Sequence, residues 1–194
     1  MEERKLNEKE SLELISQMIK NTQQKLERHN GMPFLVWGYA SFFVSVLIWT
    51  LLKNSQDYHW QFLWFLIPII GFPTMMFFLK KEDAGVKTYI DKIISYIWMG
   101  FGVAGFVVSA AAIFYWNIPI LFIVLLLMST GTAITGLVIQ FKPLIISGFL
   151  CILLSFACLV VKGFDAILIF ALVFLLMMVV PGHILNYKNK KNNV

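Results

Sequence analysis

The stretch IISYIWMGFGVAGFVVSAAAIFYWNIPILFIVLLLMSTGTAITGLVIQF, Ile93 to Phe141, contains no Asp, Glu, Lys, Arg or His. A single helix of this length would be about 73 Å long at about 1.5 Å per residue. The hydrocarbon core of a bilayer is about 30 Å thick, and about 20 helical residues cross it. The stretch must therefore cross a membrane twice. The turn is predicted at Trp116-Asn117-Ile118-Pro119, because Asn favours turns and Pro suits the first position of a helix but not its interior.

The composition of the whole chain also indicates a membrane protein. The 194 residues are 59% hydrophobic and 14% charged, with a mean hydropathy of +0.76. A soluble domain is about half apolar and about a quarter charged. A water-soluble fold could not bury so much apolar surface, so the predicted fold class is an all-α polytopic membrane protein.

Six apolar spans follow a polar N-terminal segment, which gives three predicted regions. Residues 1–32 form a cytoplasmic amphipathic helix, residues 33–182 a six-helix transmembrane bundle, and residues 183–194 a basic cytoplasmic tail. Within the bundle, Lys142-Pro143 should be a tight turn, Asp165 should cap the last span, and Pro181-Gly182 should end it. The predicted spans are Pro33–Leu52, Trp60–Leu79, Ile93–Trp116, Ile118–Phe141, Pro143–Val161 and Asp165–Pro181.

The N-terminal segment shows the spacing of an amphipathic helix from Asn7 to Asn30. Asn7 and Glu10 have the spacing of an N-cap pair, and the segment lacks the apolar centre of a cleavable signal peptide. Heptad-like spacing fits a helical partner, and the acidic first half disfavours burial among anionic headgroups. This segment is therefore the candidate partner-binding site, through an apolar stripe formed by Leu12, Ile15, Ile19 and Leu26.

The positive charges lie almost entirely on one side of the predicted topology. Of the 16 Lys and Arg residues, only Lys53 and Lys162 fall on the other side. The positive-inside rule therefore places both termini in the cytoplasm, and we expect a multi-pass protein of a bacterial inner membrane. The same cations make the pI basic, at about 9.2. Their expected role is to contact anionic lipid headgroups, so no nucleic-acid partner is expected.

Small residues recur at helical spacing in the third and fourth spans. The run from Gly100 to Gly105 matches the GxGxxG dinucleotide pattern, but no strand precedes it, so helix packing is the better interpretation. Gly105 and Ser109 are predicted to meet the backbone of another helix. The alternative is a polar pathway lined by Ser129, Thr130, Thr132, Thr135 and Gln140. The predicted packing residues are Gly102, Gly105, Ser109 and Ala112 in the third span and Ser129, Ala133 and Gly136 in the fourth.

The second span contains Pro68, Gly71 and Pro73. Each proline removes a helix hydrogen bond, so this span is predicted to be kinked. The alternative is a broken helix around a binding cavity, as in transporters.

Motifs that would carry catalysis or bind a cofactor or metal are not recognised in the sequence. His29 and His183 lie at the predicted cytoplasmic boundary, where a metal or acid–base site is conceivable, but no HExxH or paired carboxylate accompanies them. Cys151 and Cys158 are about 10 Å apart along one helix, too far for a disulfide. Since the spans hold no charged residue away from their ends, proton-coupled transport and intramembrane proteolysis are disfavoured. The chain is predicted not to be an enzyme.

Three segments resemble a group of small uncharacterised six-helix membrane proteins of Bacteroidota-type bacteria. These segments are Ser11-Leu-Glu-Leu-Ile-Ser-Gln-Met-Ile, Phe34-Leu-Val-Trp-Gly-Tyr and Val180-Pro-Gly-His-Ile-Leu. The resemblance implies a membrane protein of this size and assigns no activity and no functional residue.

Two function classes therefore remain. The first is a non-enzymatic interaction or regulatory protein that acts through its cytoplasmic N-terminal helix on a cytoplasmic protein or on a second copy of the chain. The second is a small transporter or channel for an uncharged or lipid-like solute.

Overall fold

A computed structural model describes residues 7, 9–10, 12–13, 16, 31–81, 89–114 and 118–191. All regular elements in these residues are helices, which confirms the all-α class. Six spans are long and apolar enough to cross a membrane: Gly31–Ser55, Tyr58–Phe77, Tyr89–Ala112, Ile120–Ile139, Lys142–Val160 and Asp165–Tyr187. The elements are α2 (Gly31–Ser55), η1 (Tyr58–Phe65), α3 (Leu66–Lys81), α4 (Tyr89–Phe114), α5 (Ile120–Ile139), α6 (Lys142–Ser155), α7 (Ala157–Val160), α8 (Asp165–Phe174), η2 (Leu175–Val179) and α9 (Val180–Lys191).

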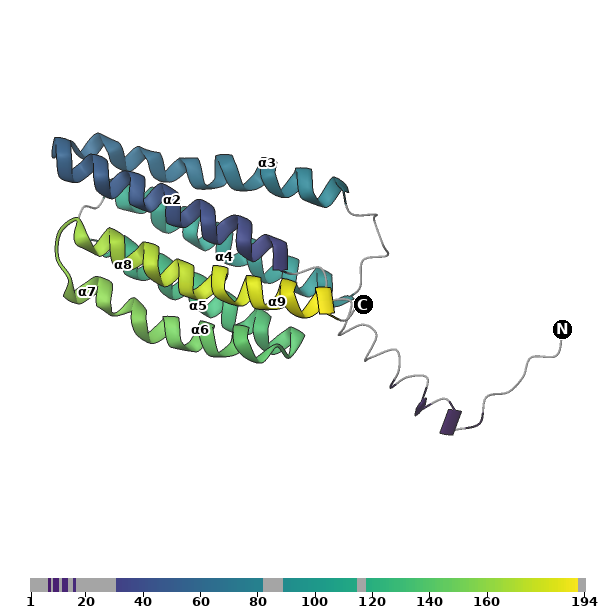
Figure 1. Ribbon diagram of the computed structural model, residues 1–194. Coiled ribbons are helices and arrows are strands. Elements are labelled where there is room, and N and C mark those ends of the chain that lie inside the picture. The colour runs from purple at the N-terminus through teal and green to yellow at the C-terminus, as the bar shows by residue number, and fades with distance from the viewer. Residues whose placement is uncertain are drawn as a thin grey trace.

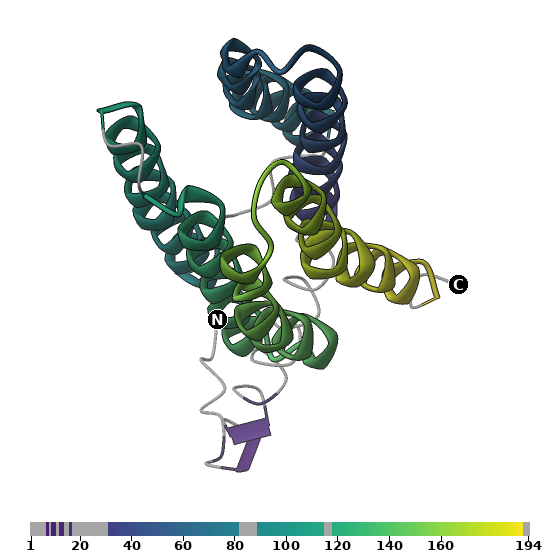
Figure 2. The same cartoon turned by 90° about the vertical axis from the view of Figure 1, so that its left-hand side faces the viewer.

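The spans run up and down, so that the start of α2 and the end of α9 lie at the same end of the molecule (Figure 1). The helices form two groups that meet at the last span (Figure 2). In one group α2 packs against α3, α8, η2 and α9, and in the other α5 packs against α4 and along α6. The largest hydrophobic cluster lies where the groups meet and includes the fully buried Leu125, Leu144, Cys151 and Met177.

The second span changes its helix type along its length. It begins as the 3₁₀-helix η1 and continues as α3, which contains Pro73 in its interior. α3 runs without interruption from Leu66 to Lys81, which argues against the alternative of a broken helix in this span; the kink stays a prediction. Gly71 lies against the Trp37 indole of α2, which leaves no room there for a side chain.

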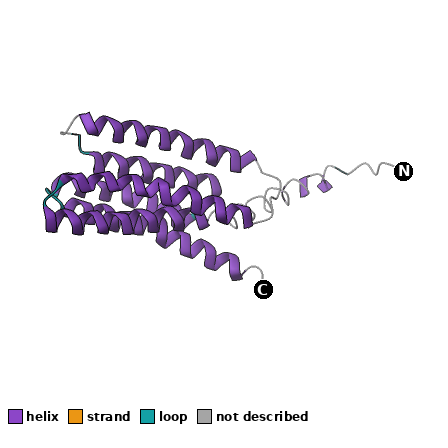
Figure 3. Cartoon of the chain, turned by 90° about the horizontal axis from the view of Figure 1, so that it is seen from above, coloured by secondary structure: helices purple, strands orange, loops and turns teal. Residues whose placement is uncertain are grey.

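The last span does not end at Pro181-Gly182, as the sequence predicted, but continues to Lys191. A π-helical segment, η2, precedes the proline and shifts the hydrogen-bond register. Pro181 has no N–H for the carbonyl of Met177 four residues earlier. The Ser147 hydroxyl of α6 lies 3.4 Å from that carbonyl and 3.1 Å from the Leu144 carbonyl of its own helix. The last helix leaves the direction of the other spans toward its C-terminal end (Figure 3), as expected of a helix with a π-bulge and a proline.

Two predicted turn and cap positions are also corrected. The turn between α5 and α6 lies at Gln140, which has a left-handed φ of 54°, and Phe141, which is extended. Lys142 is already the first residue of α6, because a proline at the second helical position is compatible with the first turn. Phe164 occupies the N-cap position of α8, and Asp165 follows it as the first helical residue.

Candidate functional site

The hydroxyl groups of α5 form hydrogen bonds within the protein and do not line a common polar pathway. Thr132 and Thr135 are fully buried, and each donates to the carbonyl four residues earlier, at 2.9 Å and 2.7 Å. Thr130 does the same at 2.7 Å. The buried Ser129 hydroxyl lies 3.2 Å from Met177 Sδ. Ser and Thr commonly satisfy their hydroxyls in this way inside helices, so these contacts favour the predicted packing over the alternative of a polar pathway.

The predicted small-residue face of α5 meets α6 at very short range. A Cβ added at Gly136 would lie 2.7 Å from the backbone N of Ile145. Ala133 faces Gly148, where an added Cβ would lie 2.6 Å from both Cα and N of Ala133. Real Cβ atoms do not approach backbone atoms so closely, so neither glycine can be replaced without moving a helix.

The predicted small-residue face of α4 is only partly used for packing. Gly102 is exposed and an added Cβ there would meet no atom within 4 Å, so the packing contact predicted for Gly102 is wrong. Gly105 is buried, but its nearest neighbour would be the flexible Met128 Cε at 3.6 Å, not a backbone. Ser109 and Ala112 are partly buried, and the Ser109 hydroxyl donates to the Gly105 carbonyl. Along this face of α4, Gly105 therefore meets a flexible side chain, and Gly102 meets no neighbouring atom. α4 packs mainly against α5.

Other glycines that the spacing argument did not select form the closest contact of α2. A Cβ at Gly38 would lie 2.7 Å from Val179 Cγ2 and 3.3 Å from the Val179 N of the last span. Gly31 and Gly182 approach each other across the same interface. A single glycine in an apolar run carries no periodic signal, so these positions become visible only when the two helices are placed together.

The predicted partner-binding stripe is described at one of its four positions. The backbone N of Asn7 donates to Glu10 Oε2 at 3.1 Å, the reciprocal bond of a capping box. Leu12 lies in the helical part that follows, and its side chain is 67% exposed. Ile15, Ile19 and Leu26 lie outside the described residues, as does His29.

Charged and aromatic side chains of α2 contact Asp165 at the start of α8. Asp165 Oδ1 accepts a hydrogen bond from Trp49 Nε1 at 3.1 Å and lies 4.0 Å from Lys53 Nζ. The Lys53 ammonium also lies 4.6 Å from the centre of the Trp49 ring, within cation–π range. We refer to this end of the bundle as the Asp165 end.

Asp57 and His59 form a second polar group at the Asp165 end. Asp57 Oδ1 accepts hydrogen bonds from the backbone N of His59 at 3.0 Å and contacts its Nδ1 at 2.6 Å. These bonds lower the pKa of Asp57 below its ordinary value of 3.8, the backbone bond contributing most. Asp57 thereby caps η1 through its charged form. The cap is complete above that ordinary value and is lost as the pH falls through the lowered pKa.

Among the residues that the structure describes, His183 contacts a tyrosine and no carboxylate. Its Nε2 lies 2.7 Å from the Tyr39 hydroxyl of α2, and both side chains are exposed. In the part of the chain that the structure describes, no three His, Cys, Asp or Glu residues come together as metal ligands. Cys151 and Cys158 are free, and their thiols lie 3.8 Å from the carbonyls of Val173 and Ala166 respectively.

Comparison with protein-family models, with curated proteins and with solved structures finds no match to this chain.

Proposed function

We propose that this six-span membrane protein is a non-enzymatic interaction or regulatory protein whose N-terminal helix, on the cytoplasmic side, binds a protein partner. The observation that carries the proposal is the exposed Leu12 on a capped helix start. The capping bond stabilises a helix at this position, and among the residues that the structure describes the leucine stays 67% exposed. A helix partner at this stripe would remove that apolar surface from water.

In this proposal the six-span bundle anchors the N-terminal helix to the membrane. The buried hydroxyls of α5 are bonded to backbone carbonyls and to Met177. Gly136 and Gly148 meet the backbone of the facing helix, and Gly38 meets the side chain and backbone of Val179. These are the features of tight helix packing in a membrane, and they weigh against the alternative of solute passage through the bundle.

A double substitution of the stripe tests the proposal. Leu12→Asp with Ile15→Asp should leave the melting temperature of the full-length protein in detergent unchanged, because the change lies outside the spans. It should abolish self-association or partner capture, measured by crosslinking in intact cells, because two carboxylates would have to be desolvated in the contact.

A matched control adds the same charge elsewhere on the helix. Gln17→Asp with Gln24→Asp lies on the opposite face at about 100° per residue and should retain the crosslinks. Equal crosslinking by the stripe variant and the wild type would remove the main support for an interaction helix and favour the transport alternative.

A further inference from the structure

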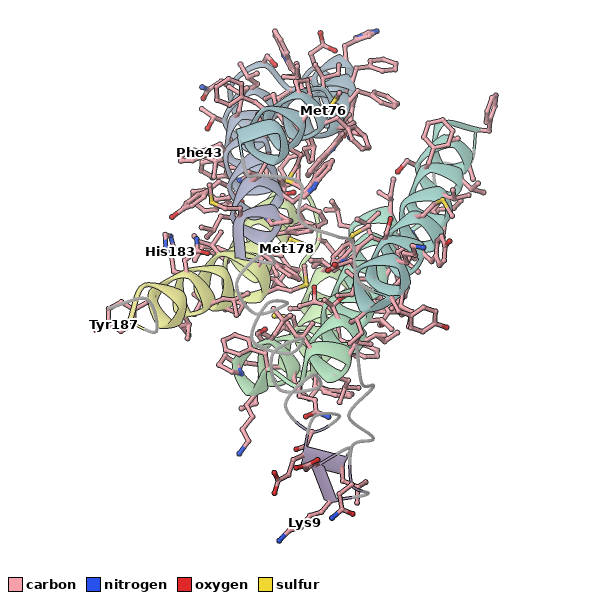
Figure 4. All side chains as sticks on the ribbon, turned by 90° about the vertical axis from the view of Figure 1, so that its right-hand side faces the viewer. Lys9, Phe43, Met76, Met178, His183 and Tyr187 are labelled. Carbon is pink, nitrogen blue, oxygen red and sulfur yellow. The ribbon has the colours of Figure 1, made fainter. Side chains whose placement is uncertain are left out.

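Tyr39 and His183 form a polar pair on the lipid-facing surface between α2 and α9. The Tyr39 hydroxyl lies 2.7 Å from His183 Nε2, and the two rings meet edge to face at 5.9 Å. Figure 4 shows His183, Phe43 and Tyr187 on the same side of the molecule. Exposed apolar side chains surround the pair, including Phe43, which stacks on Tyr39, and Ile184. This surface has the apolar composition of a face that meets lipid.

The depth of the pair can be measured from the Asp165 end, where Lys53 and Asp165 lie side by side. Tyr39 is about 21 Å from Lys53 along α2, and His183 about 27 Å from Asp165 along the last span, at about 1.5 Å per residue. The hydrocarbon core is about 30 Å thick. The pair therefore lies close to the opposite headgroup boundary, where lipid oxygens begin to be within reach.

The hydrogen bond leaves one donor of the pair unused. If the Tyr39 hydroxyl donates to Nε2, the neutral ring carries its hydrogen on Nδ1. If Nε2 donates instead, the hydroxyl hydrogen is free. No other hydrogen-bond partner of either side chain is found in the described part of the chain. A donor exposed at the edge of the hydrocarbon is costly unless something outside the protein accepts from it.

The sequence beyond the pair is suited to a negatively charged acceptor. Tyr187 lies one turn after His183 on the same face of α9 and is 74% exposed. Lys188, Lys190 and Lys191 complete the helix. Donors at the boundary followed by cations beyond it match a phosphate group whose acyl chains lie along the apolar face.

We propose that Tyr39, His183 and Tyr187 form a binding site for the headgroup phosphate of an anionic phospholipid, held in the seam between α2 and α9. The free donor of the Tyr39–His183 pair bonds a phosphate oxygen, and the lysines of α9 favour the anionic lipid over a zwitterionic one. The site is separate from the N-terminal helix, so it does not depend on the function proposed above.

The test is lipid binding to the full-length protein in detergent, counted by native mass spectrometry during titration with phosphatidylglycerol or phosphatidylcholine. The wild type should bind phosphatidylglycerol more tightly. Tyr39→Phe and His183→Phe should each weaken that binding about tenfold, as expected for loss of a hydrogen bond to a charged acceptor. Tyr96→Phe is the control, because Tyr96 is an exposed tyrosine on a different helix, α4, and it should bind as the wild type does.

Three results would overturn the proposal: equal binding of both lipids by the wild type, unchanged binding by Tyr39→Phe, or the same loss in Tyr96→Phe. Release of phosphatidylglycerol by inorganic phosphate at matched concentration would also overturn it, since the ligand would then be free phosphate. Tyr39→Phe removes one oxygen atom only, so it decides the outcome even if His183→Phe does not fold.

Discussion

Replacing Gly148 by leucine should prevent the bundle from folding or lower its melting temperature sharply. A Cβ at this position would lie 2.6 Å from both Cα and N of Ala133 in α5. The neighbour is backbone and cannot rotate away, so α5 and α6 would have to separate along their extensive contact. Overpacking of a core typically costs about 1–3 kcal/mol, and we expect about 3 kcal/mol or more here. Thermal melting in detergent, followed by circular dichroism, measures the effect.

Gly102→Leu is the matched control for this prediction. It introduces the same side chain into a spanning helix, at a glycine where an added Cβ meets no atom within 4 Å. Its melting temperature should stay close to that of the wild type. If the two variants melted alike, the close contact between α5 and α6 would be refuted.

The second large effect concerns the sidedness of the loops. With Cys151 and Cys158 replaced, a cysteine at Asn54 or Phe164 should react with an impermeant thiol reagent added outside sealed cells. A cysteine at Gly85 should react only after the cells are opened. The reason is the charge distribution, in which only Lys53 and Lys162 among the 16 Lys and Arg residues belong to the loops that the positive-inside rule places outside.

The labelling result is close to all-or-none, because each loop lies wholly on one side. Labelling at Gly85 in sealed cells, with protection at Asn54 and Phe164, would reverse the orientation. The N-terminal helix would then face away from the cytoplasm and could not bind a cytoplasmic partner.

The six spans could be predicted from the sequence because each is a long apolar run. The helical length of such a run, compared with the thickness of the bilayer core, gives the number of crossings. The ends of the spans were less predictable. The sequence predicts that Pro181 ends the last span, but the helix continues through it after a π-helical segment, with the Ser147 hydroxyl of another helix near the Met177 carbonyl. Neither can be recognised from the last span alone.

The packing contacts between helices could be predicted only in part. Spacing identified Ala133 and Gly136 on α5, which the structure places against α6. The same rule selected Gly102, which meets nothing, and passed over Gly38 and Gly148. Small residues make close approach possible, but the partner helix is set by the arrangement of the whole bundle.

One candidate site could be predicted from the sequence and the other could not. The capped start of the N-terminal helix is local in sequence, and the bond between Asn7 and Glu10 is present as the spacing predicted. The contact between Tyr39 and His183 joins the first and last spans. It could not be predicted, because it depends on how α2 and α9 lie against each other.

The central claim is that the stripe of the N-terminal helix contacts protein. The most direct test places a photoreactive phenylalanine analogue at Leu12 in the full-length chain and irradiates intact cells. We expect a crosslinked protein adduct from position 12 and much less from Glu13, which is exposed but lies off the stripe. Equal adducts from both positions, or adducts with lipid alone from position 12, would contradict it.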